Sequence, residues 1–332
     1  MSDTTPEPVI LDGVDDLVYR ACAVLAGTQL DLFTPLKDGP LSASQIAEYI
    51  GVEMNKLRPL LHALVIVGLL TVEDGYFANT DEADYYLVRG HPSYQGNRHK
   101  YWSDVWSAAL LIAESIRTGK PQKKHDYAVM SEGELEEFLA GLYPWSFDSG
   151  TWLAQNYDFS SCQTVLDAGG GSGALVIALT EAWSHLQAMV IELPAVVPIT
   201  QRFVERAGAT ARVQVKGVDL VRQSLAGSFD AAILKAVIQT MSLEEAYRVL
   251  LNINPALKPG ATVYIWDRPL DDSRLTPQDL ALFNVVFPSI YEHGQKYTVR
   301  EYRDLLTETG FENCELHTVA DSNRIIIARK AK

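Results

Sequence analysis

A glycine-rich turn between an apolar strand and an apolar helix restricts the fold of this chain more than any other part of its sequence. In the segment VLDAGGGSGAL, a buried strand is expected to end at Asp167, and Gly169 and Gly171 follow in a tight turn before a helix begins. Glycine is required where the backbone turns sharply and approaches a ligand with no Cβ in the way. The spacing is not the G-x-G-x-x-G of dinucleotide folds. Glu192 ends the next predicted strand, 25 residues after Asp167, where a carboxylate is placed to accept hydrogen bonds from ribose hydroxyls.

Strands and helices alternate along the second half of the chain. The segments AMVIELP, ARVQVKGVDL, FDAAILKAVIQ and ATVYIWDRPL are typical of strands, and the helix that starts at SLEEA is expected to end at Pro259-Gly260. The segments CELHTVA and RIIIARK are expected to close the sheet as an antiparallel pair. Alternation of this kind indicates a doubly wound, mostly parallel sheet. We therefore predict an α/β, Rossmann-like domain over residues 161–332.

Residues 1–98 carry the pattern of an all-helical winged-helix domain whose helices are followed by a hairpin. Ser42 and Gln45 form a predicted capping box, and LLTVEDGYFANT reads as two short strands joined through Asp-Gly. Within residues 1–85, four basic residues stand against fourteen acidic ones, so DNA phosphates would be repelled. The helices also carry more apolar surface than so small a unit needs to bury within itself. Packing and dimerisation are therefore the expected roles of this domain.

Residues 99–160 are predicted to form a helical connector that is rich in aromatic side chains. Two interpretations stay open: packing within the core and between domains, or the wall of a pocket for a flat apolar substrate. The connector contains a polar loop, residues 119–134. His125 in this loop is either a residue near the mouth of the substrate pocket or an ordinary loop residue.

The composition, with 332 residues, 47% hydrophobic and 21% charged, indicates an ordinary soluble protein. The net charge of −14 argues against a nucleic-acid partner and against an anionic membrane surface. Cys22, Cys162 and Cys314 are too far apart for a disulfide framework or for the spacing of metal ligands, so no metal is expected. The sequence has neither a signal peptide nor an apolar stretch long enough to cross a bilayer, which predicts a cytoplasmic location without a membrane partner.

Together these segments resemble the class I S-adenosylmethionine-dependent methyltransferases, and more narrowly the small-molecule O-methyltransferases of the plant caffeate and hydroxyindole type. The resemblance covers nearly the whole chain, from TQLDLFTPLKDGPLSASQIAEYIGV through VLDAGGGSGAL, VIELP, GVDL and LKAVIQ to YTVREYRDLLTETGF. It implies S-adenosylmethionine as the cofactor, a small-molecule acceptor, and a homodimer formed through the N-terminal domain. The cofactor-binding residues that it implies are Asp167, Gly169, Gly171, Glu192, Leu193, Asp219, Leu220 and Lys235.

The resemblance also implies which part of the cofactor each of these residues binds. Gly169 and its neighbours would cradle the methionine part, and Glu192 would hold the ribose. Asp219 and Leu220 would flank the adenine, with Asp219 accepting a hydrogen bond from its exocyclic amine. Lys235 would close over the adenine side. From the residues alone, Asp219 and Lys235 are placed only at the carboxyl edges of strands, where ligands bind in such sheets.

The chain departs from this family at the catalytic position. The histidine that serves as general base in these O-methyltransferases falls on Gln239, and the aspartate and tryptophan that usually follow it fall on Thr240 and Met241. Two acidic residues normally orient the base. The first falls on Asp267, and the second falls on Lys296, which reverses the charge.

Gln239 cannot take a proton, because an amide only donates and accepts hydrogen bonds. Loss of a general base costs roughly 10²–10⁴ in rate. Positioning an acceptor in line with an activated methyl group supplies roughly 7–11 kcal/mol without one. Two hypotheses follow for the site: Lys296 stabilises a phenolate or enolate by its charge, or His293 is a displaced base.

The expected function is methyl transfer to a small, flat, aromatic secondary metabolite. Oxygen is the methylated atom by resemblance to the family, and Gln239 leaves carbon and nitrogen open. The alternative is an enzyme of the same fold that binds the cofactor without transferring its methyl group, in a decarboxylation, a rearrangement or a pericyclic ring closure. A non-catalytic binding protein or winged-helix regulator is the third interpretation.

Overall fold

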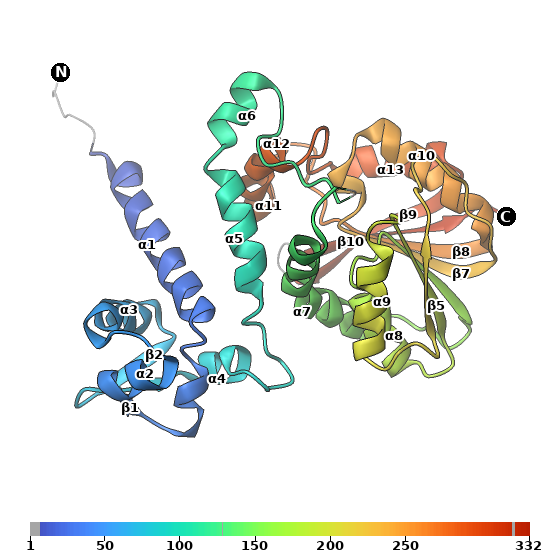
Figure 1. Cartoon of the computed structure of the whole chain (residues 1–332). Helices are drawn as coiled ribbons and strands as arrows, with labels where there is room; N and C mark the ends of the chain where they lie inside the picture. The colour runs from blue at the N-terminus through green and yellow to red at the C-terminus, as the bar shows by residue number, and fades with distance from the viewer. Residues whose placement is uncertain (1–6, 128, 321–322) are drawn as a thin grey trace, which may run out of the picture. The chain divides into compact units, whose positions relative to one another are not determined.

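The computed structural model describes residues 7–127, 129–320 and 323–332. The chain divides into two compact units, Met1–Ser103 and Asp104–Lys332 (Figure 1). The division falls inside helix α5, Arg98–Ala109. Within the described residues, the chain has no helix with the length and apolar character needed to cross a membrane.

The first unit is built from short helices and a small sheet. A capping box starts one of these helices, because Ser42 Oγ accepts from the Gln45 backbone N–H at 3.3 Å and the Gln45 side chain accepts from the Ser42 N–H at 2.9 Å. The predicted hairpin turns through Asp74 and Gly75, whose φ angles of 48° and 83° suit a type I′ turn. The elements are α1 Val9–Gln29, η1 Thr34–Asp38, β1 Leu41–Ser42, α2 Ala43–Ile50, α3 Met54–Val67, β2 Leu70–Glu73, β3 Tyr76–Asn79 and α4 Asp81–Leu87.

The small sheet of this unit has the order β1-β3-β2, so the unit is helical apart from these strands. Strand β1 was not predicted, because two residues are too few to show a period of two. Its pairing with β3 places Leu41 opposite Phe77. Phe77 is buried together with Phe33, Ile46 and Leu61, so the hairpin and the helices share one core.

A seven-stranded sheet forms the centre of the second unit, with the order β6-β5-β4-β7-β8-β10-β9. The first five strands are parallel, and β10 and β9 add an antiparallel edge, which confirms the predicted doubly wound sheet. The strands are β4 Thr164–Ala168, β5 Gln187–Glu192, β6 Val213–Gly217, β7 Phe229–Lys235, β8 Leu257–Trp266, β9 Phe311–Ala320 and β10 Asn323–Lys330.

Helices cover both faces of this sheet (Figure 1). One face packs on helices α10 and α13 through a core that includes Leu250 and Leu305, and the other packs on α7 and α8 through Leu153 and Leu175. The helices of the second unit are α6 Ile112–Thr118, α7 Glu132–Asn156, α8 Ala174–Ala182, α9 Val197–Arg206, η2 Ile238–Thr240, α10 Leu243–Ile253, η3 Asn254–Ala256, α11 Gln278–Phe283, η4 Asn284–Val286, α12 Phe287–Ile290 and α13 Val299–Glu308.

Helices α7 and α8 approach each other at Gly150. A Cβ placed on Gly150 would lie 2.0 Å from the Leu175 carbonyl oxygen and 2.9 Å from the Ala178 Cβ. Both distances are shorter than van der Waals contact, so the two helix backbones pack without a side chain between them at this point. Helix α7 is thereby held against the helix that follows the glycine-rich turn.

Two predicted boundaries were wrong. The strand FDAAILKAVIQ ends at Lys235, since Ala236 takes a left-handed φ of 59° and the chain continues into η2. The helix expected to run to Pro259-Gly260 ends earlier, and both of those residues lie inside β8. They lie where β8 shifts its register against β7, and a proline is tolerated at such an irregularity because no ladder hydrogen bond is lost there.

Candidate active site

A cavity of about 280 Å³ opens at the carboxyl edge of β4, β5 and β7. This edge is where the strand order reverses in a doubly wound sheet, and ligands bind there. One wall consists of strand ends and the segments that follow them, together with Val249 of α10: Gly169, Gly170, Gly171, Ser172, Ile191, Glu192, Leu193, Val196, Val218, Asp219, Leu220, Val221, Lys235, Ala236, Val237, Thr240, Met241 and Val249. The other wall is formed by Tyr127 and by residues of α7: Leu135, Phe138, Leu139, Leu142, Trp145 and Ser146.

The glycine-rich turn and Glu192 form the most ordered part of the first wall. Glu192 Oε1 accepts from the Gly171 backbone N–H at 2.7 Å, and Oε2 accepts from the Leu193 N–H at 2.9 Å. Burial raises the pKa of this carboxyl, and the two N–H groups oppose the shift. Gly169 has a φ of 74°, and a Cβ there would stand 2.7 Å from Val237 Cγ2. The turn therefore requires glycine at position 169 for both its conformation and its packing.

Asp167 lies beneath this turn and does not line the cavity. It is 1% exposed, and its Oδ2 has no hydrogen-bond partner among the described residues. Burial, followed by the charge of Glu192, raises the pKa of Asp167 to about 7, while Lys235 opposes the shift. Two carboxyl groups thus lie close to the glycine-rich turn, which favours a cation such as the ammonium or sulfonium of S-adenosylmethionine over an anion.

The other residues predicted to bind the cofactor also lie along this wall. Asp219, Leu220, Leu193 and Lys235 line the cavity. Asp219 Oδ1 accepts from the Val221 N–H at 3.0 Å, so its own loop holds the carboxylate in place. The structure therefore brings together all the residues for which the sequence predicts cofactor contacts, with Asp167 one layer below.

Lys235 is the last residue of β7, where it pairs with Trp266 of β8, and its side chain reaches the helical wall. Its Nζ lies 4.6 Å from the centroid of the Trp145 ring and 3.4 Å from Ser146 Oγ. Burial lowers the pKa of Lys235 to about 8, although Asp167 and Asp267 oppose the shift. In this structure the ammonium group contacts α7, so Lys235 connects the two walls of the cavity.

Asp267 explains why the predicted strand stops short of Gln239. Asp267 Oδ1 accepts from the Val237 N–H at 3.1 Å, and Oδ2 accepts from the Gln239 N–H at 2.9 Å and from the Tyr302 hydroxyl at 2.9 Å. These bonds take the place of strand pairing for the backbone after Lys235. The acidic residue that orients the base in the family falls on Asp267. Its carboxylate here holds the backbone on which position 239 is carried.

Gln239 and Lys296 meet in a buried contact, with side chains that are 8% and 3% exposed. Lys296 Nζ donates to Gln239 Oε1 and to the Asp267 carbonyl oxygen, the latter at 2.8 Å. The rings of Phe283 and Phe287 each have their centroid 5.8 Å from the same Nζ. Burial lowers the pKa of Lys296 to about 7, against the opposing charge of Asp267. The structure thus brings three of the four predicted catalytic residues together: Gln239, Asp267 and Lys296. They lie next to the wall residues Val237 and Thr240 and are not themselves among the residues that line the cavity.

His293 does not join this cluster. Its side chain is exposed, and it is not among the residues that line the cavity. The next residue, Gly294, lies against the backbone of η2, where a Cβ would stand 2.7 Å from the Gln239 carbonyl oxygen. Gly294 and Lys296 make the close contacts between this loop and η2, and the imidazole of His293 lies outside these contacts.

Sequence reasoning missed the partner of His125. His125 is 7% exposed, and its Nε2 lies 2.6 Å from Asp104 Oδ2 in α5. Lys123 Nζ lies 2.9 Å from the other oxygen of the same carboxylate. The imidazole ring also contacts the rings of Phe138 and Tyr127, whose side chains line the cavity. Nothing in the sequence signals this pairing, because Asp104 lies 21 residues earlier on a helix without a motif.

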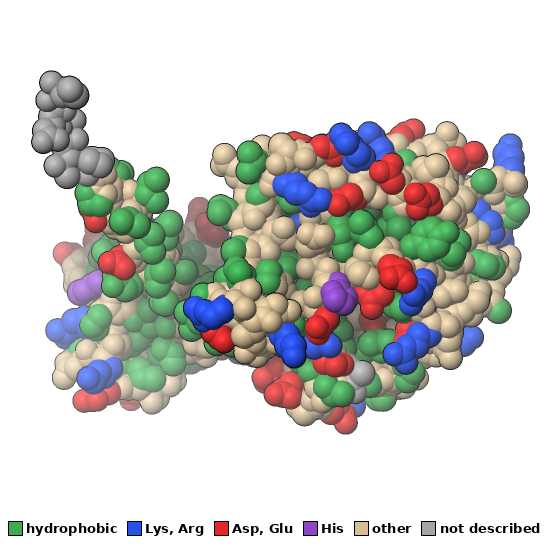
Figure 2. All heavy atoms as spheres, turned by 90° about the horizontal axis from the view of Figure 1, so that it is seen from above, with side chains coloured by type: hydrophobic (Ala, Val, Ile, Leu, Met, Phe, Trp, Pro, Cys, Tyr) green, Lys and Arg blue, Asp and Glu red, His purple; other side chains and the backbone are tan. Residues whose placement is uncertain are grey.

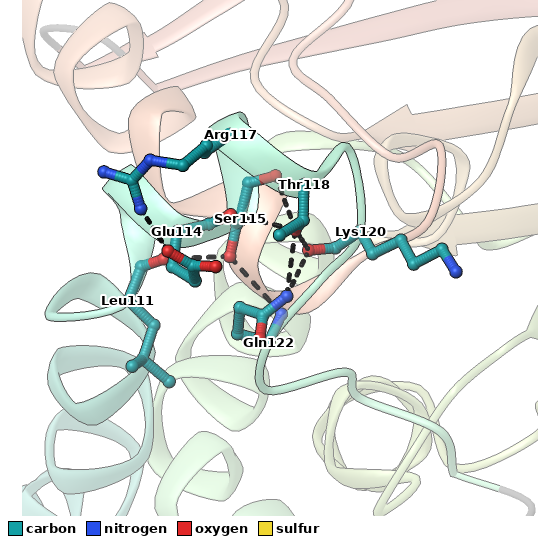
Figure 3. A network of polar contacts seen from close by, with 7 residues as sticks. All are labelled: Leu111, Glu114, Ser115, Arg117, Thr118, Lys120 and Gln122. Carbon is teal, nitrogen blue, oxygen red and sulfur yellow. Dashed lines mark hydrogen bonds and ion pairs between the residues drawn. The ribbon is translucent and has the colours of Figure 1, made fainter.

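The loop that carries His125 is fixed where it leaves α6. Figure 3 shows the Gln122 side chain reaching back to Thr118 Oγ1 at 3.0 Å and to the Lys120 carbonyl oxygen at 3.1 Å. The Gln122 N–H donates to Ser115 Oγ at 3.3 Å. Further on, the His125 N–H donates to the Ile290 carbonyl oxygen at 2.8 Å. His125 is therefore held in a packed layer behind the cavity wall.

The sheet order, the glycine-rich turn and the carboxylate after the second strand define a class I S-adenosylmethionine-dependent methyltransferase. A family model for the O-methyltransferase domain matches residues 113–312, and a model for the O-methyltransferase dimerisation domain matches residues 18–89. The chain belongs to this O-methyltransferase family, and S-adenosylmethionine is its cofactor. Within the described residues, no cluster of side chains suited to hold a metal ion is found.

The chain is similar to two biosynthetic enzymes along almost its whole length. A 3-hydroxy-5-methyl-1-naphthoate 3-O-methyltransferase of Streptomyces sahachiroi is 30% identical over 311 residues, which cover 91% of this chain and 89% of the relative. A tetracenomycin polyketide synthesis 8-O-methyltransferase of Streptomyces glaucescens is 27% identical, covering 95% and 94%. The structure of human N-acetylserotonin methyltransferase in complex with S-adenosylmethionine shares the fold, with a TM-score of 0.86, 22% identity and 100% of both chains covered.

Proposed function

We propose that the protein methylates a small, flat, aromatic metabolite and works as a homodimer. The observation that carries the proposal is the shape of the one cavity described above, which joins the glycine-rich turn to an apolar helical wall. S-adenosylmethionine, when bound, supplies an activated methyl group on a sulfonium. The residues of the chain then have two tasks, which are to hold that group and to bring an acceptor atom in line with it.

The residues proposed to hold the cofactor follow from the chemistry of the first wall. Gly169 and Gly171 leave room for the methionine part, and Asp167 beneath them favours its positive charge. Glu192 has the carboxylate needed to accept hydrogen bonds from ribose hydroxyls, with Leu193 beside it. The remaining wall residues Asp219, Leu220 and Lys235 are proposed to enclose the adenine.

The second wall supports an aromatic acceptor. Leu135, Phe138, Leu142 and Trp145 present apolar and aromatic surface on one side of α7, and Tyr127 adds a ring with a hydroxyl. One of the two biosynthetic relatives is named for a naphthoate substrate and the other for tetracenomycin polyketide synthesis, which agrees with this wall. Oxygen is the proposed methylated atom, by membership in the family, and the net charge of −14 gives no support for a nucleic-acid substrate.

The homodimer is proposed to form through the first unit. Seven apolar side chains of α1 are exposed, and Ile10, Val14 and Leu17 follow one another at helical spacing on one face, with exposures of 85%, 48% and 69%. Figure 2 shows hydrophobic side chains gathered on the unit that carries the N-terminus. An exposed apolar helix face of this kind marks a protein–protein interface.

The experiment that tests the proposed function combines turnover and cofactor binding. The protein is incubated with S-adenosylmethionine and a panel of hydroxylated naphthalenes and naphthoates, and S-adenosylhomocysteine and methylated product are measured together. Equal amounts of both are expected. Product without S-adenosylhomocysteine would contradict methyl transfer.

Substitution of Glu192 tests the cofactor half separately. We expect Glu192→Gln to weaken S-adenosylhomocysteine binding about 10-fold to 100-fold in calorimetry, because a hydrogen bond to a charged group contributes about 1.5–3 kcal/mol. The matched control is Glu308→Gln, at an exposed glutamate on α13. Unchanged affinity in Glu192→Gln would remove this residue from the proposed cofactor site.

A further inference from the structure

The contact between Lys296 and Gln239 fixes which way the Gln239 amide points. A lysine ammonium has three donors and no acceptor, so the amide atom that faces it must be the oxygen, as the structure has it. A planar amide carries its NH₂ group on the opposite side from this contact. Lys296 therefore presents Gln239 to the rest of the site as a hydrogen-bond donor.

The donor end of Gln239 is available for a ligand. The backbone N–H of Gln239 is bound to Asp267, and its Oε1 is bound to Lys296, but no partner for its Nε2 is found in the described part of the chain. The neighbouring residues Val237 and Thr240 both line the cavity. This Nε2 is not among the fully buried side-chain atoms that lack a partner, so it keeps accessible surface beside these wall residues, where a bound molecule can accept its hydrogen bond.

Three cations, Lys235, Lys296 and Arg268, lie near Gln239, and the carboxylates of Asp167, Asp267 and Asp279 lie among them. Burial lowers the pKa of Lys235 and of Lys296, and the nearby charge of Arg268 adds to the lowering at both, so these three cations lie close enough to repel one another. Asp267 has both carboxylate oxygens occupied by Val237, Gln239 and Tyr302. The Asp267 carboxylate is thus used in holding the protein itself, and Arg268 is paired with Asp279, which leaves the Gln239 amide as the donor that the cluster offers to a ligand.

From this arrangement we infer that the acceptor is an acidic hydroxyl compound, a phenol or enol conjugated with a carbonyl, which binds in its ionised form against the Gln239 amide. Lys296 is then a positioning residue that orients and polarises that amide. This inference rests on the proposed methyl transfer. The proton leaves to solvent before binding, the oxyanion forms the bond to the methyl carbon, and the carbon–sulfur bond breaks with its electron pair remaining on sulfur.

Two probes of similar shape and different acidity test this inference. 2-Hydroxy-1,4-naphthoquinone is ionised at neutral pH, whereas 2-naphthol is neutral. We expect the protein to methylate the ionised probe with a kcat/KM at least about 10² higher, the factor typical of a missing general base. Equal rates for the two probes, or methylation of 2-naphthol alone, would overturn the inference.

A lysine substitution tests the role of Lys296 in the same assay. Lys296→Met is expected to lower kcat on the ionised probe about 10²-fold, as loss of an oxyanion donor does, while leaving S-adenosylhomocysteine affinity unchanged. The matched control is Lys216→Met, at an exposed lysine of β6. An unchanged kcat in a folded Lys296→Met protein would contradict the assignment.

A spectrum of the bound probe keeps the inference testable if Lys296→Met does not fold. The wild-type complex with S-adenosylhomocysteine is titrated with 2-naphthol at a pH below the free ionisation of this probe. The absorption band of the naphtholate anion is expected in the complex. Binding of the neutral form would overturn the inference. So would a complex that holds S-adenosylhomocysteine but binds neither probe. Failure to bind S-adenosylhomocysteine would instead contradict the proposed function.

Discussion

Asp267 accepts hydrogen bonds from two backbone N–H groups and from the Tyr302 hydroxyl. The sequence placed this residue in the right cluster, next to Gln239 and Lys296, because the family motif fixes its position on the sheet. Its partners could not be predicted, since side-chain bonds to backbone depend on where the strand stops. At the scale of single residues, position follows from the motif and role follows from the contacts.

Lys296 leads to a prediction about the pH dependence of stability. Its pKa falls from 10.5 to about 7 on folding, so the folded state binds fewer protons than the unfolded chain between these values. Burial of Lys296 therefore disfavours folding fully below pH 7, and this cost shrinks as the pH rises toward 10.5. The free energy of unfolding of the wild type relative to Lys296→Met is expected to increase from pH 6.5 to pH 9, on the order of 1 kcal/mol per unit.

Urea denaturation at several pH values measures this difference. Lys296→Met also leaves the Gln239 side-chain oxygen and the Asp267 carbonyl oxygen without a donor, which costs the variant about 1–3 kcal/mol each. This loss shifts the difference in the free energy of unfolding between the two proteins by a constant amount at every pH. The slope with pH is unaffected by that loss. A difference that stays flat or falls with rising pH would show that Lys296 keeps its ordinary pKa.

For His293, by contrast, we predict that substitution has almost no effect on turnover. Because its side chain is exposed and does not line the cavity, His293→Ala is expected to change kcat and kcat/KM less than 2-fold, within about 0.4 kcal/mol. Steady-state turnover of any acceptor found by the panel measures it. A loss of about 10² would restore His293 as the displaced base that the sequence suggested.

Helix α5 and the loop after α6 are joined by one carboxylate. Burial alone would raise the pKa of Asp104, but His125 first and Lys123 next outweigh it and lower that pKa below 3.8. A lowered pKa means that the ionised carboxylate stabilises the folded state above pH 3.8 and that this stabilisation is lost as the pH falls through the folded value. The contact joins α5 to the loop in which the wall residue Tyr127 follows His125 by two positions.

Substitution of Asp104 should therefore reduce stability in a pH-dependent way. Asp104→Asn is expected to lower the free energy of unfolding by about 1.5–3 kcal/mol at pH 7, the range for a hydrogen bond to a charged group. The difference from the wild type is expected to disappear in acid, below pH 3.8. Asp304→Asn, at an exposed aspartate, is the control, and an equal effect of both variants would contradict the pairing.

At the scale of elements, the periodic segments could be predicted and their ends could not. The glycine-rich turn, the capping box of Ser42 and the Asp74-Gly75 hairpin are local patterns, and each appears where the sequence placed it. The end of β7 depends on Asp267, which follows 32 residues later in the chain. The His125–Asp104 pair likewise depends on packing between distant segments. Patterns among neighbouring residues in the sequence cannot predict such contacts.

At the scale of the whole molecule, helix α1 presents an exposed apolar stripe. Ile10→Glu combined with Leu17→Glu places charges on this face, so we expect the protein to dissociate toward monomers in analytical ultracentrifugation, at a cost of several kcal/mol at the interface. Asp12→Asn on the opposite face of the helix is the control. A doubly substituted protein with the sedimentation of the wild type would place the interface elsewhere.

The close approach of α7 and α8 at Gly150 has a consequence for how such enzymes diverge. The apolar wall stands on α7, the glycine-rich turn leads into α8, and the two backbones touch with no side chain between them. A chain built in this way cannot widen its acceptor cavity by moving the helix without also disturbing the turn. New acceptors are therefore most readily acquired by exchanging side chains such as Phe138 or Leu142, while the cofactor half is inherited unchanged.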